Sequence, residues 1–149
     1  MLTVLQRVSQ ASVTVDGNTI GRIEHGLLVL LCAERGDTTA QADALLAKIL
    51  KLRIFADEAG RMNRSVQDVG GGLLVVSQFT LAADARKGNR PSFTAAADPE
   101  SGKSLYEYFL GRAREEHPVV ACGEFGANMQ VHLVNDGPVT IPLRITPEL

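Results

Sequence analysis

The sequence contains no tryptophan, and only two tyrosines and five phenylalanines occur among its 149 residues. A hydrophobic core must therefore be built mainly from aliphatic side chains, which the apolar content of 45% supplies. No apolar run reaches the roughly 18 residues that would span a bilayer, and the N-terminus lacks a signal-peptide pattern. We therefore expect one domain over residues 1–149, located in the cytoplasm.

Cysteine and histidine are also scarce. Cys32 and Cys122 lie far apart, each in an apolar stretch, which favours two buried thiols over a disulfide framework or a zinc site. His25, His117 and His132 have neither metal-ligand spacing nor a serine or cysteine partner in a known catalytic motif. Glycine-rich nucleotide-binding motifs are missing too. The sequence thus predicts no metal and no cofactor.

An excess of positive charge is missing as well, because the formal net charge is −2 at pH 7. A nucleic-acid partner would have to be bound by a local basic patch. The one clear cluster lies in "DARKGNRPSF", residues 84–93, where Arg86, Lys87 and Arg90 surround a Gly-Asn turn. These cations are candidate phosphate contacts, although a solvated surface loop would have the same composition.

Segments with the composition of β-strands make up much of the first eighty residues. They are residues 2–8, residues 12–15, the stretch from a turn at 16–18 to Ile23, and residues 26–34, 53–55 and 73–79. The continuous apolar run 26–34 predicts a buried central strand, and residues 73–79 predict a second buried strand.

Two amphipathic helices are predicted between these strands and the C-terminus. Thr38 and Gln41 have the spacing of a capping box at the start of the first helix. Asp98-Pro99 supplies the N-cap and first residue of the second helix, which Pro118 ends. Their apolar faces comprise Ala42, Leu45, Leu46, Ile49 and Leu50 in the first helix, and Leu105, Phe109 and Ala113 in the second.

The C-terminal stretch "VHLVNDGPVTIPLRI", residues 131–145, predicts two strands joined by a turn at Asn135-Asp136-Gly137. Pro138 is unusual there, because it removes a backbone donor where the second strand would begin. Together the elements predict an α/β (α+β-like) fold in which a curved, barrel-like sheet carries two helices packed on one side. Sequence pattern alone does not choose between α+β and α/β.

The most credible polar site is "SQFT", at the end of the second buried strand. Polar side chains at a strand end are held rigidly and often line small-molecule sites. Thr80 is a candidate nucleophile, but a threonine hydroxyl needs a nearby base, and Asp84 is the closest in sequence. The alternative is a strand end that is merely capped by polar residues.

Four segments in order resemble the D-aminoacyl-tRNA deacylases, homodimeric chirality-proofreading enzymes that are also known as D-tyrosyl-tRNA deacylases. They are "QRVSQASVTVDG" at 6–17, "GLLVLL" at 26–31, "SQFTLAADARKGNRPSF" at 77–93 and "FGANMQVHLVNDGPVT" at 125–140. The resemblance extends over almost the whole chain. Cys32 departs from the resemblance, because the family more often has glycine at this position.

The resemblance implies hydrolysis of the ester bond of D-aminoacyl-tRNA, and also of glycyl-tRNA mischarged on tRNA-Ala. It implies that the Gly137-Pro138 peptide bond is cis and enters the active site of the other subunit. A fixed backbone there would exclude the Cβ of an L-amino acid while leaving the side chain of a D-amino acid unread. The enzyme would thus be a homodimer with active sites at the interface.

Residue roles also follow from the resemblance. Arg7 and Thr140 would steady the Gly-Pro loop, and Phe125 and Met129 would line the pocket of the terminal adenosine. The ester would be bound and polarised by the side chains and backbone N–H groups of Ser77, Gln78, Phe79 and Thr80. Either Thr80 or a water assisted by the tRNA 2′-OH would attack, and we favour the water because no base for Thr80 is evident.

Two other function classes remain open at this stage. A general esterase would use Thr80 on small substrates and would cleave free D-amino-acid esters as well as charged tRNA. A non-catalytic RNA-binding module would depend on the cations at 86–90, and the modest net charge weakens that interpretation.

Overall fold

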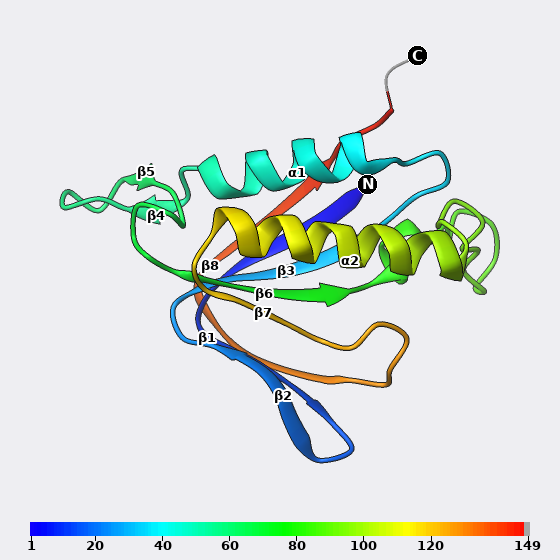
Figure 1. Ribbon diagram of the computed structural model, residues 1–149, viewed down its shortest axis with the longest axis horizontal. Coiled ribbons are helices and arrows are strands. Elements are labelled where there is room, and N and C mark those ends of the chain that lie inside the picture. Colours follow the sequence, from blue (N-terminus) through cyan, green and yellow to red (C-terminus); the bar gives the residue numbers. More distant parts are fainter. Residues whose placement is uncertain (148–149) are drawn as a thin grey trace.

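The computed structural model describes residues 1–147 and consists of a curved sheet covered on one side by two helices (Figure 1). The elements in chain order are β1 (Leu2–Val15), β2 (Asn18–Ile23), β3 (Gly26–Cys32), α1 (Thr39–Lys51), β4 (Phe55–Ala56), β5 (Met62–Arg64), β6 (Gly72–Ser77), the 3₁₀ turn η1 (Phe79–Ala82), α2 (Pro99–Glu116), β7 (Val120–Cys122) and β8 (Gln130–Arg144). Within residues 1–147, no helix is long and apolar enough to cross a membrane.

The main sheet is mixed and has the order β2-β1-β3-β6-β7, with β8 also paired to β1. Strands β3, β6 and β7 run parallel, whereas β1 is antiparallel to β2, β3 and β8. The first half of β1 pairs with β3 and its second half with β2. This change of partner curls the sheet below the helices, which confirms the predicted barrel-like fold (Figure 1).

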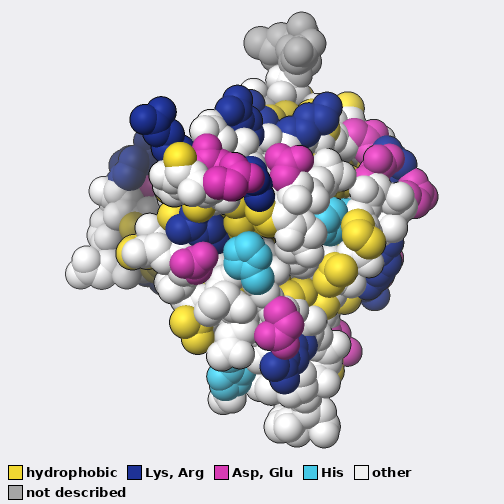
Figure 2. Space-filling view, turned by 90° about the vertical axis from the view of Figure 1, so that its left-hand side faces the viewer, with side chains coloured by type: hydrophobic (Ala, Val, Ile, Leu, Met, Phe, Trp, Pro, Cys, Tyr) yellow, Lys and Arg dark blue, Asp and Glu magenta, His cyan; other side chains and the backbone are white. Residues whose placement is uncertain are grey.

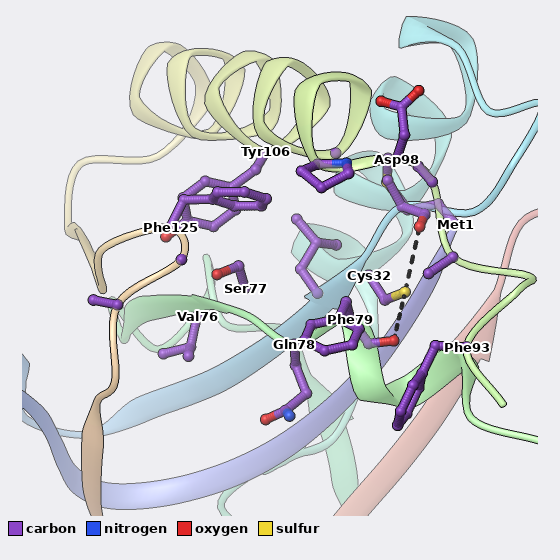
Figure 3. Close-up of a pocket in the computed structure, with 18 of the residues that line it drawn as sticks. Met1, Cys32, Val76, Ser77, Gln78, Phe79, Phe93, Asp98, Tyr106 and Phe125 are labelled. Carbon is purple, nitrogen blue, oxygen red and sulfur yellow. Dashed lines mark hydrogen bonds between the residues drawn. The ribbon is translucent and has the colours of Figure 1, made fainter. Parts of the chain in front are cut away.

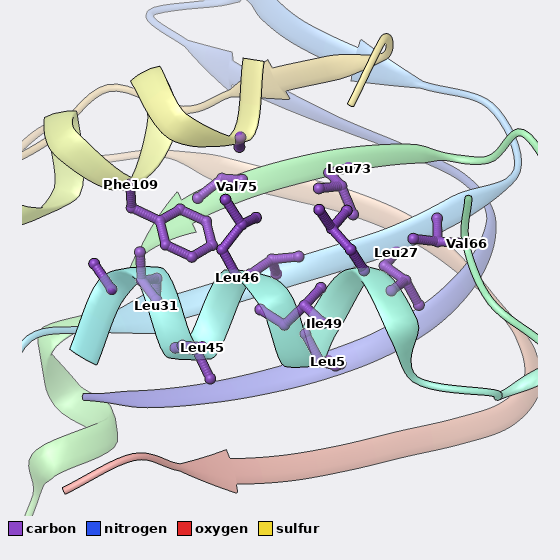
Figure 4. Packing of buried hydrophobic residues seen from close by; sticks show 14 of the residues in the cluster. Leu5, Leu27, Leu31, Leu45, Leu46, Ile49, Val66, Leu73, Val75 and Phe109 are labelled. Carbon is purple, nitrogen blue, oxygen red and sulfur yellow. The ribbon is translucent and has the colours of Figure 1, made fainter. Parts of the chain in front are cut away.

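The main hydrophobic core lies between the sheet and the helices, where Leu5, Leu27 and Leu73 meet Leu45 and Ile49 of α1 and Phe109 of α2 (Figure 4). A second cluster fills the inside of the curl and comprises Val8, Ala11, Val13, Ile23, Leu28, Leu74 and Val76. Aliphatic residues dominate both clusters, as the scarcity of aromatic residues requires.

Both helices begin as the sequence predicts. The Thr38 N–H donates to Oε1 of Gln41 at 2.6 Å, and the Thr38 hydroxyl accepts from the Ala40 N–H at 3.2 Å. Asp98 caps α2 by accepting from the Ser101 N–H at 2.7 Å, with Pro99 as the first helical residue. These contacts satisfy N–H groups that the first turn of a helix leaves free.

The predicted hairpin at 131–145 is wrong. Residues Gln130–Arg144 form one strand, β8, which pairs with β1 along almost its whole length. Val8 lies opposite Asn135 and Gln6 lies opposite Thr140, so the segment 136–139 forms a wide bulge within β8. The Asn-Asp-Gly-Pro sequence therefore interrupts a strand without reversing it, because β1 provides a partner on both sides of the interruption.

Smaller corrections concern strand ends. The strand expected at 53–55 begins only at Phe55, which pairs with Arg64 of β5. The strand expected at 73–79 ends at Ser77, and Phe79 begins the turn η1. The SQFT segment therefore spans a strand end and the tight turn that follows it.

Candidate active site

A cavity of about 700 Å³ lies at the ends of β3 and β6, beneath the N-terminal end of α2 (Figure 3). Its walls come from the loop after β3, residues 76–79, the loop before α2, and the segment 125–131. Most of the lining is apolar, and the side chains of Ser77, Gln78, Arg35 and Asp98 add polar groups. Such a cavity can hold a group of nucleoside size while a few polar contacts orient it.

The side chain of Ser77 lines this cavity, and within residues 1–147 its Oγ has no hydrogen-bond partner. Figure 3 draws Ser77 at the end of β6, between the Tyr106–Phe125 ring pair and Gln78. After Gln78, Phe79 and Thr80 form the first two residues of η1. No acceptor for the N–H groups of Phe79 and Thr80 occurs among the described residues, as expected where a helical turn begins.

Thr80 does not line the cavity. Its side chain is exposed, and its Oγ1 accepts a short hydrogen bond from the amide nitrogen of Gln78. Asp84, the nearest acid in sequence, is held by Arg86 through its Nε at 2.9 Å and its Nη2 at 2.7 Å. These hydrogen bonds lower the pKa of Asp84 to about 2, which leaves a weak base with both oxygens occupied.

The loop 84–92 closes on itself at its base, where Asp84 and Ser92 exchange backbone hydrogen bonds of 2.7 and 2.8 Å. Arg86, Lys87 and Arg90 all lie exposed on this loop. The Asp84 carboxylate neutralises Arg86, whereas Lys87 and Arg90 form no ion pair within the described part of the chain. Phe93, just beyond the loop, meets Phe79 edge-on with ring centroids 5.2 Å apart at the cavity wall.

Phe125 and Met129 both line the cavity on the side opposite η1. The Phe125 ring lies 5.8 Å from the ring of Tyr106, a buried residue of α2. Cys32 forms part of the cavity floor and donates from Sγ to the Phe79 carbonyl at 3.5 Å (Figure 3). Burial raises the pKa of the Cys32 thiol to about 11, so this group is protonated at neutral pH.

The bulge of β8 carries Gly137 and Pro138, which are both exposed and are joined by a cis peptide bond. Arg7 holds the start of this bulge: its Nε donates to the Asp136 carbonyl at 2.9 Å, and its Nη1 donates to the Ile54 carbonyl at 2.7 Å. Val139 is buried in the main core and anchors the other side. Thr140 pairs with Gln6 and makes no side-chain hydrogen bond within residues 1–147.

Within one chain, this bulge and the cavity lie at opposite ends of the sheet (Figure 1). Thr140, Gln6, Leu28 and Leu74 are neighbours across β8, β1, β3 and β6, and Ser77 lies three residues beyond Leu74. Three strand spacings and three residue rises separate Thr140 from Ser77 by about 17 Å in a flat sheet. Figure 2 views the bulge end, where cationic and anionic side chains lie intermixed.

Some cavity residues were not singled out from the sequence. Tyr106, Phe93 and Arg35 line it, yet their local patterns indicate only a helix face and two loops. Asp98 was recognised as a helix cap, and the Ser101 N–H that it accepts from lowers its pKa. A pairing of α2 with the ends of β3 and β6 is a tertiary contact, and no short sequence signal predicts it.

The fold and the cavity define a small α/β protein with an apolar pocket whose edge offers a hydroxyl and N–H donors that have no partner among residues 1–147. Such donors can hold and polarise a carbonyl group. Within residues 1–147, no group of three or more His, Cys, Asp or Glu side chains is arranged to hold a metal ion.

Comparison with known proteins identifies the family. A family model described as D-Tyr-tRNA(Tyr) deacylase matches residues 4–144. The D-aminoacyl-tRNA deacylase of Paracidovorax citrulli (strain AAC00-1) is 71% identical over 99% of this chain and 95% of its own length. The chain therefore belongs to the D-Tyr-tRNA(Tyr) deacylase family, which makes it a hydrolase.

Solved structures agree in fold. A c-Myc DNA unwinding element binding protein is 43% identical and superposes with a TM-score of 0.94, covering 99% of this chain and 100% of its own. A probable eukaryotic D-amino acid tRNA deacylase has a TM-score of 0.78 over 97% of this chain and 98% of its own. At 19% identity, the second likeness demonstrates the fold alone.

Proposed function

We propose that this chain hydrolyses the ester bond of D-aminoacyl-tRNA, and of glycyl-tRNA, at the cavity between η1 and the segment 125–131, as part of translational proofreading. The main support is the cavity itself, which is large enough for the terminal adenosine and has two free N–H donors at its edge. Family membership supplies the reaction.

The terminal adenosine binds against Phe125 and Met129. Both side chains line the cavity, and an aromatic face with a polarizable thioether suits a planar base. An adenosine in this position directs its ribose, and the ester that it carries, toward Ser77. The cavity thus recognises the end that all tRNAs share, so one site serves many aminoacyl-tRNAs.

The ester carbonyl is polarised by the N–H groups of Phe79 and Thr80. Backbone donors at the start of η1 are already ordered, so they stabilise the developing oxyanion without a further change of structure. The Ser77 hydroxyl is free to orient the ester or the ribose. Removal of one such donor in other enzymes costs about a hundredfold in rate or more.

A water molecule, assisted by the 2′-OH of the terminal ribose, is the attacking group. Two observations favour water over Thr80. The Thr80 oxygen accepts a hydrogen bond from Gln78, and the acid closest to it in sequence, Asp84, is paired with Arg86. Aminoacyl esters hydrolyse readily once they are oriented and polarised.

Gly137 and Pro138 of a partner subunit complete the site. In one chain Thr140 lies about 17 Å from Ser77 by strand geometry, and Gly137 and Pro138 precede Thr140 on the side of β8 away from Ser77, so they reach a cavity only in a homodimer. A two-fold dimer would place each bulge against the opposite cavity and create two identical sites. Arg7 and Val139 hold the bulge on both sides, which makes it a rigid group.

The exposed backbone of this bulge acts as the chiral selector. Its carbonyl groups bind the α-ammonium of the substrate, and a D side chain then points away into open space. An L side chain would direct its Cβ into the backbone, and such a clash discriminates more strongly than an apolar pocket does. Glycine has no Cβ and is therefore cleaved.

Lys87 and Arg90 contact tRNA phosphates. Arg86 contributes less, because Asp84 partly neutralises it.

The experiment is hydrolysis of D-tyrosyl-, L-tyrosyl- and glycyl-tRNA by the purified protein at equal substrate concentration. We expect rapid loss of the D and glycyl esters while the L ester stays intact. Equal loss of the D and L esters would keep the hydrolase and overturn the chiral role of Gly137 and Pro138. Free D-tyrosine methyl ester serves as the control, because its cleavage at the same rate would favour a general esterase.

A further inference from the structure

The hydroxyl of Tyr106 lies at the junction between β6 and the segment that carries Phe125. It lies 3.1 Å from the Val75 carbonyl and 3.3 Å from the Gly123 carbonyl. The Val75 carbonyl also accepts from the Gly123 N–H at 2.9 Å. One buried side chain of α2 thus bonds to the strand two residues before Ser77 and to the segment two residues before Phe125.

The ring of Tyr106 contributes a second contact. It lines the cavity and lies 5.8 Å from the Phe125 ring, so both ends of the Tyr106 side chain act on the same wall (Figure 3). Tyr106 is 5% exposed, and its burial raises the pKa of its hydroxyl, which therefore stays protonated and able to donate. Gly123 is also packed closely against Met129, because a Cβ added at Gly123 would lie 2.6 Å from the Met129 sulfur.

We infer that Tyr106 is a positioning residue that fixes the distance between the ester-binding strand end at Ser77 and the adenosine-binding residues Phe125 and Met129. This inference rests on the proposed function of the cavity. Tyr106 acts through its hydrogen bonds to Val75 and Gly123 and touches the substrate only as part of the wall. Without the hydroxyl, the segment 123–129 loses one of its ties to β6, and the adenosine and the ester no longer fit their two subsites together.

The same helix offers a matched control. Tyr108 lies two residues further along α2, and its hydroxyl donates to the Asp43 carboxylate of α1 at 2.9 Å. It does not line the cavity. Tyr106→Phe and Tyr108→Phe therefore make the same chemical change in the same helix, and each removes one hydroxyl whose proton is shared between two acceptors. Only the Tyr106 hydroxyl joins two segments that line the cavity.

The experiment measures binding of an adenosine that carries D-tyrosine through a 3′ amide, which cannot be hydrolysed as an ester. We expect Tyr106→Phe to weaken binding by about three- to tenfold, the effect of one lost hydrogen bond, and Tyr108→Phe to change it by less than about twofold. With D-tyrosyl-tRNA, Tyr106→Phe should raise KM by a similar factor while kcat stays within about twofold. Urea unfolding of both variants measures their stability separately.

A purely structural role would lower the stability of both variants and leave the affinity of Tyr106→Phe unchanged, and that result would overturn the inference. Hydrogen exchange of the Gly123 amide gives a second measurement, and we expect it to be faster in Tyr106→Phe only. If Tyr106→Phe does not fold, hydrogen exchange of the wild-type chain replaces it: we expect the Gly123 amide, which donates to the Val75 carbonyl, to exchange as slowly as the amides inside β6, and exchange as fast as that of an exposed loop would overturn the inference. No binding by the wild-type chain would overturn the adenosine assignment and, with it, this inference.

Discussion

At the scale of single residues, hydrogen-bond partners decide which side chains can react. Thr80 and Asp84 look like a nucleophile and its base in the sequence, but the structure pairs Thr80 with Gln78 and Asp84 with Arg86. Ser77, by contrast, lines the cavity with a hydroxyl that has no partner in the described part of the chain. The residue types were visible in the sequence, whereas their partners depend on how the turn η1 folds.

Replacing Thr80 by valine tests the attacking group. Valine keeps the shape and removes the hydroxyl, so we expect turnover of D-tyrosyl-tRNA to stay within about tenfold of wild type. Single-turnover kinetics would measure the chemical step. Loss of about a thousandfold or more in Thr80→Val, with analogue binding intact and activity retained in Thr80→Ser, would instead identify Thr80 as the nucleophile.

Cys32 provides a test at high pH. The folded pKa of this thiol, about 11, lies above its unfolded value of 9.0. The folded chain therefore holds this proton more tightly, and the resulting stability is present below pH 9 and is lost as the pH rises through 11. Urea unfolding should show a steeper fall in stability between these values for wild type than for Cys32→Ala. Equal slopes would contradict the assigned burial of the thiol.

At the scale of elements, local signals predicted the helices and failed at the β8 bulge. The capping residues Thr38 and Asp98 act within a few residues of their helices, so the sequence alone indicates where both helices begin. The bulge at 136–139 depends on β1, which lies more than a hundred residues earlier and pairs on both sides of it. A turn sequence without knowledge of that partner predicts a hairpin.

Gly137→Ala tests whether the bulge needs its present backbone. Gly137 has φ of +140°, and an added Cβ would lie 2.8 Å from the Val139 nitrogen and 2.9 Å from its Cγ2. We expect a loss of about 1–3 kcal/mol in the free energy of unfolding, together with a large loss of D-ester hydrolysis. Gly17→Ala is the control, because its φ is +79° and nothing lies within 4 Å of the added Cβ. Full activity of Gly137→Ala would contradict a role for the bulge in the site.

The loop 84–92 makes a second prediction at this scale. Lys87→Gln and Arg90→Gln should each lower the slope of log affinity for tRNA against log salt by about 0.7–0.9, the value for one phosphate contact. Arg86→Gln should lower it less, because Asp84 already neutralises Arg86. Affinity measured at several salt concentrations checks this order. A larger effect of Arg86 than of Arg90 would contradict it.

At the scale of the whole molecule, the cavity and the β8 bulge occupy opposite ends of the same sheet. The curved sheet and its helical cover followed from hydrophobic periodicity. The SQFT segment stood out as polar residues at a strand end, whereas Phe125, Met129 and Arg7 were assigned only through family resemblance. Apolar or charged residues in loops have no local pattern that reveals a cavity wall, because α2, β6 and the segment 123–129 meet only in the folded chain.

The most direct test of a site shared between subunits mixes two damaged chains. A bulge variant, Gly137→Ala/Pro138→Ala, and a cavity variant, Phe125→Ala/Met129→Ala, are co-expressed with different affinity tags, and the mixed dimer is purified through both. Each variant alone should hydrolyse D-tyrosyl-tRNA poorly. The mixed dimer should regain about half of the wild-type activity, because one of its two sites combines an intact cavity with an intact bulge. Absence of any recovery in a stable mixed dimer would contradict the cross-subunit site.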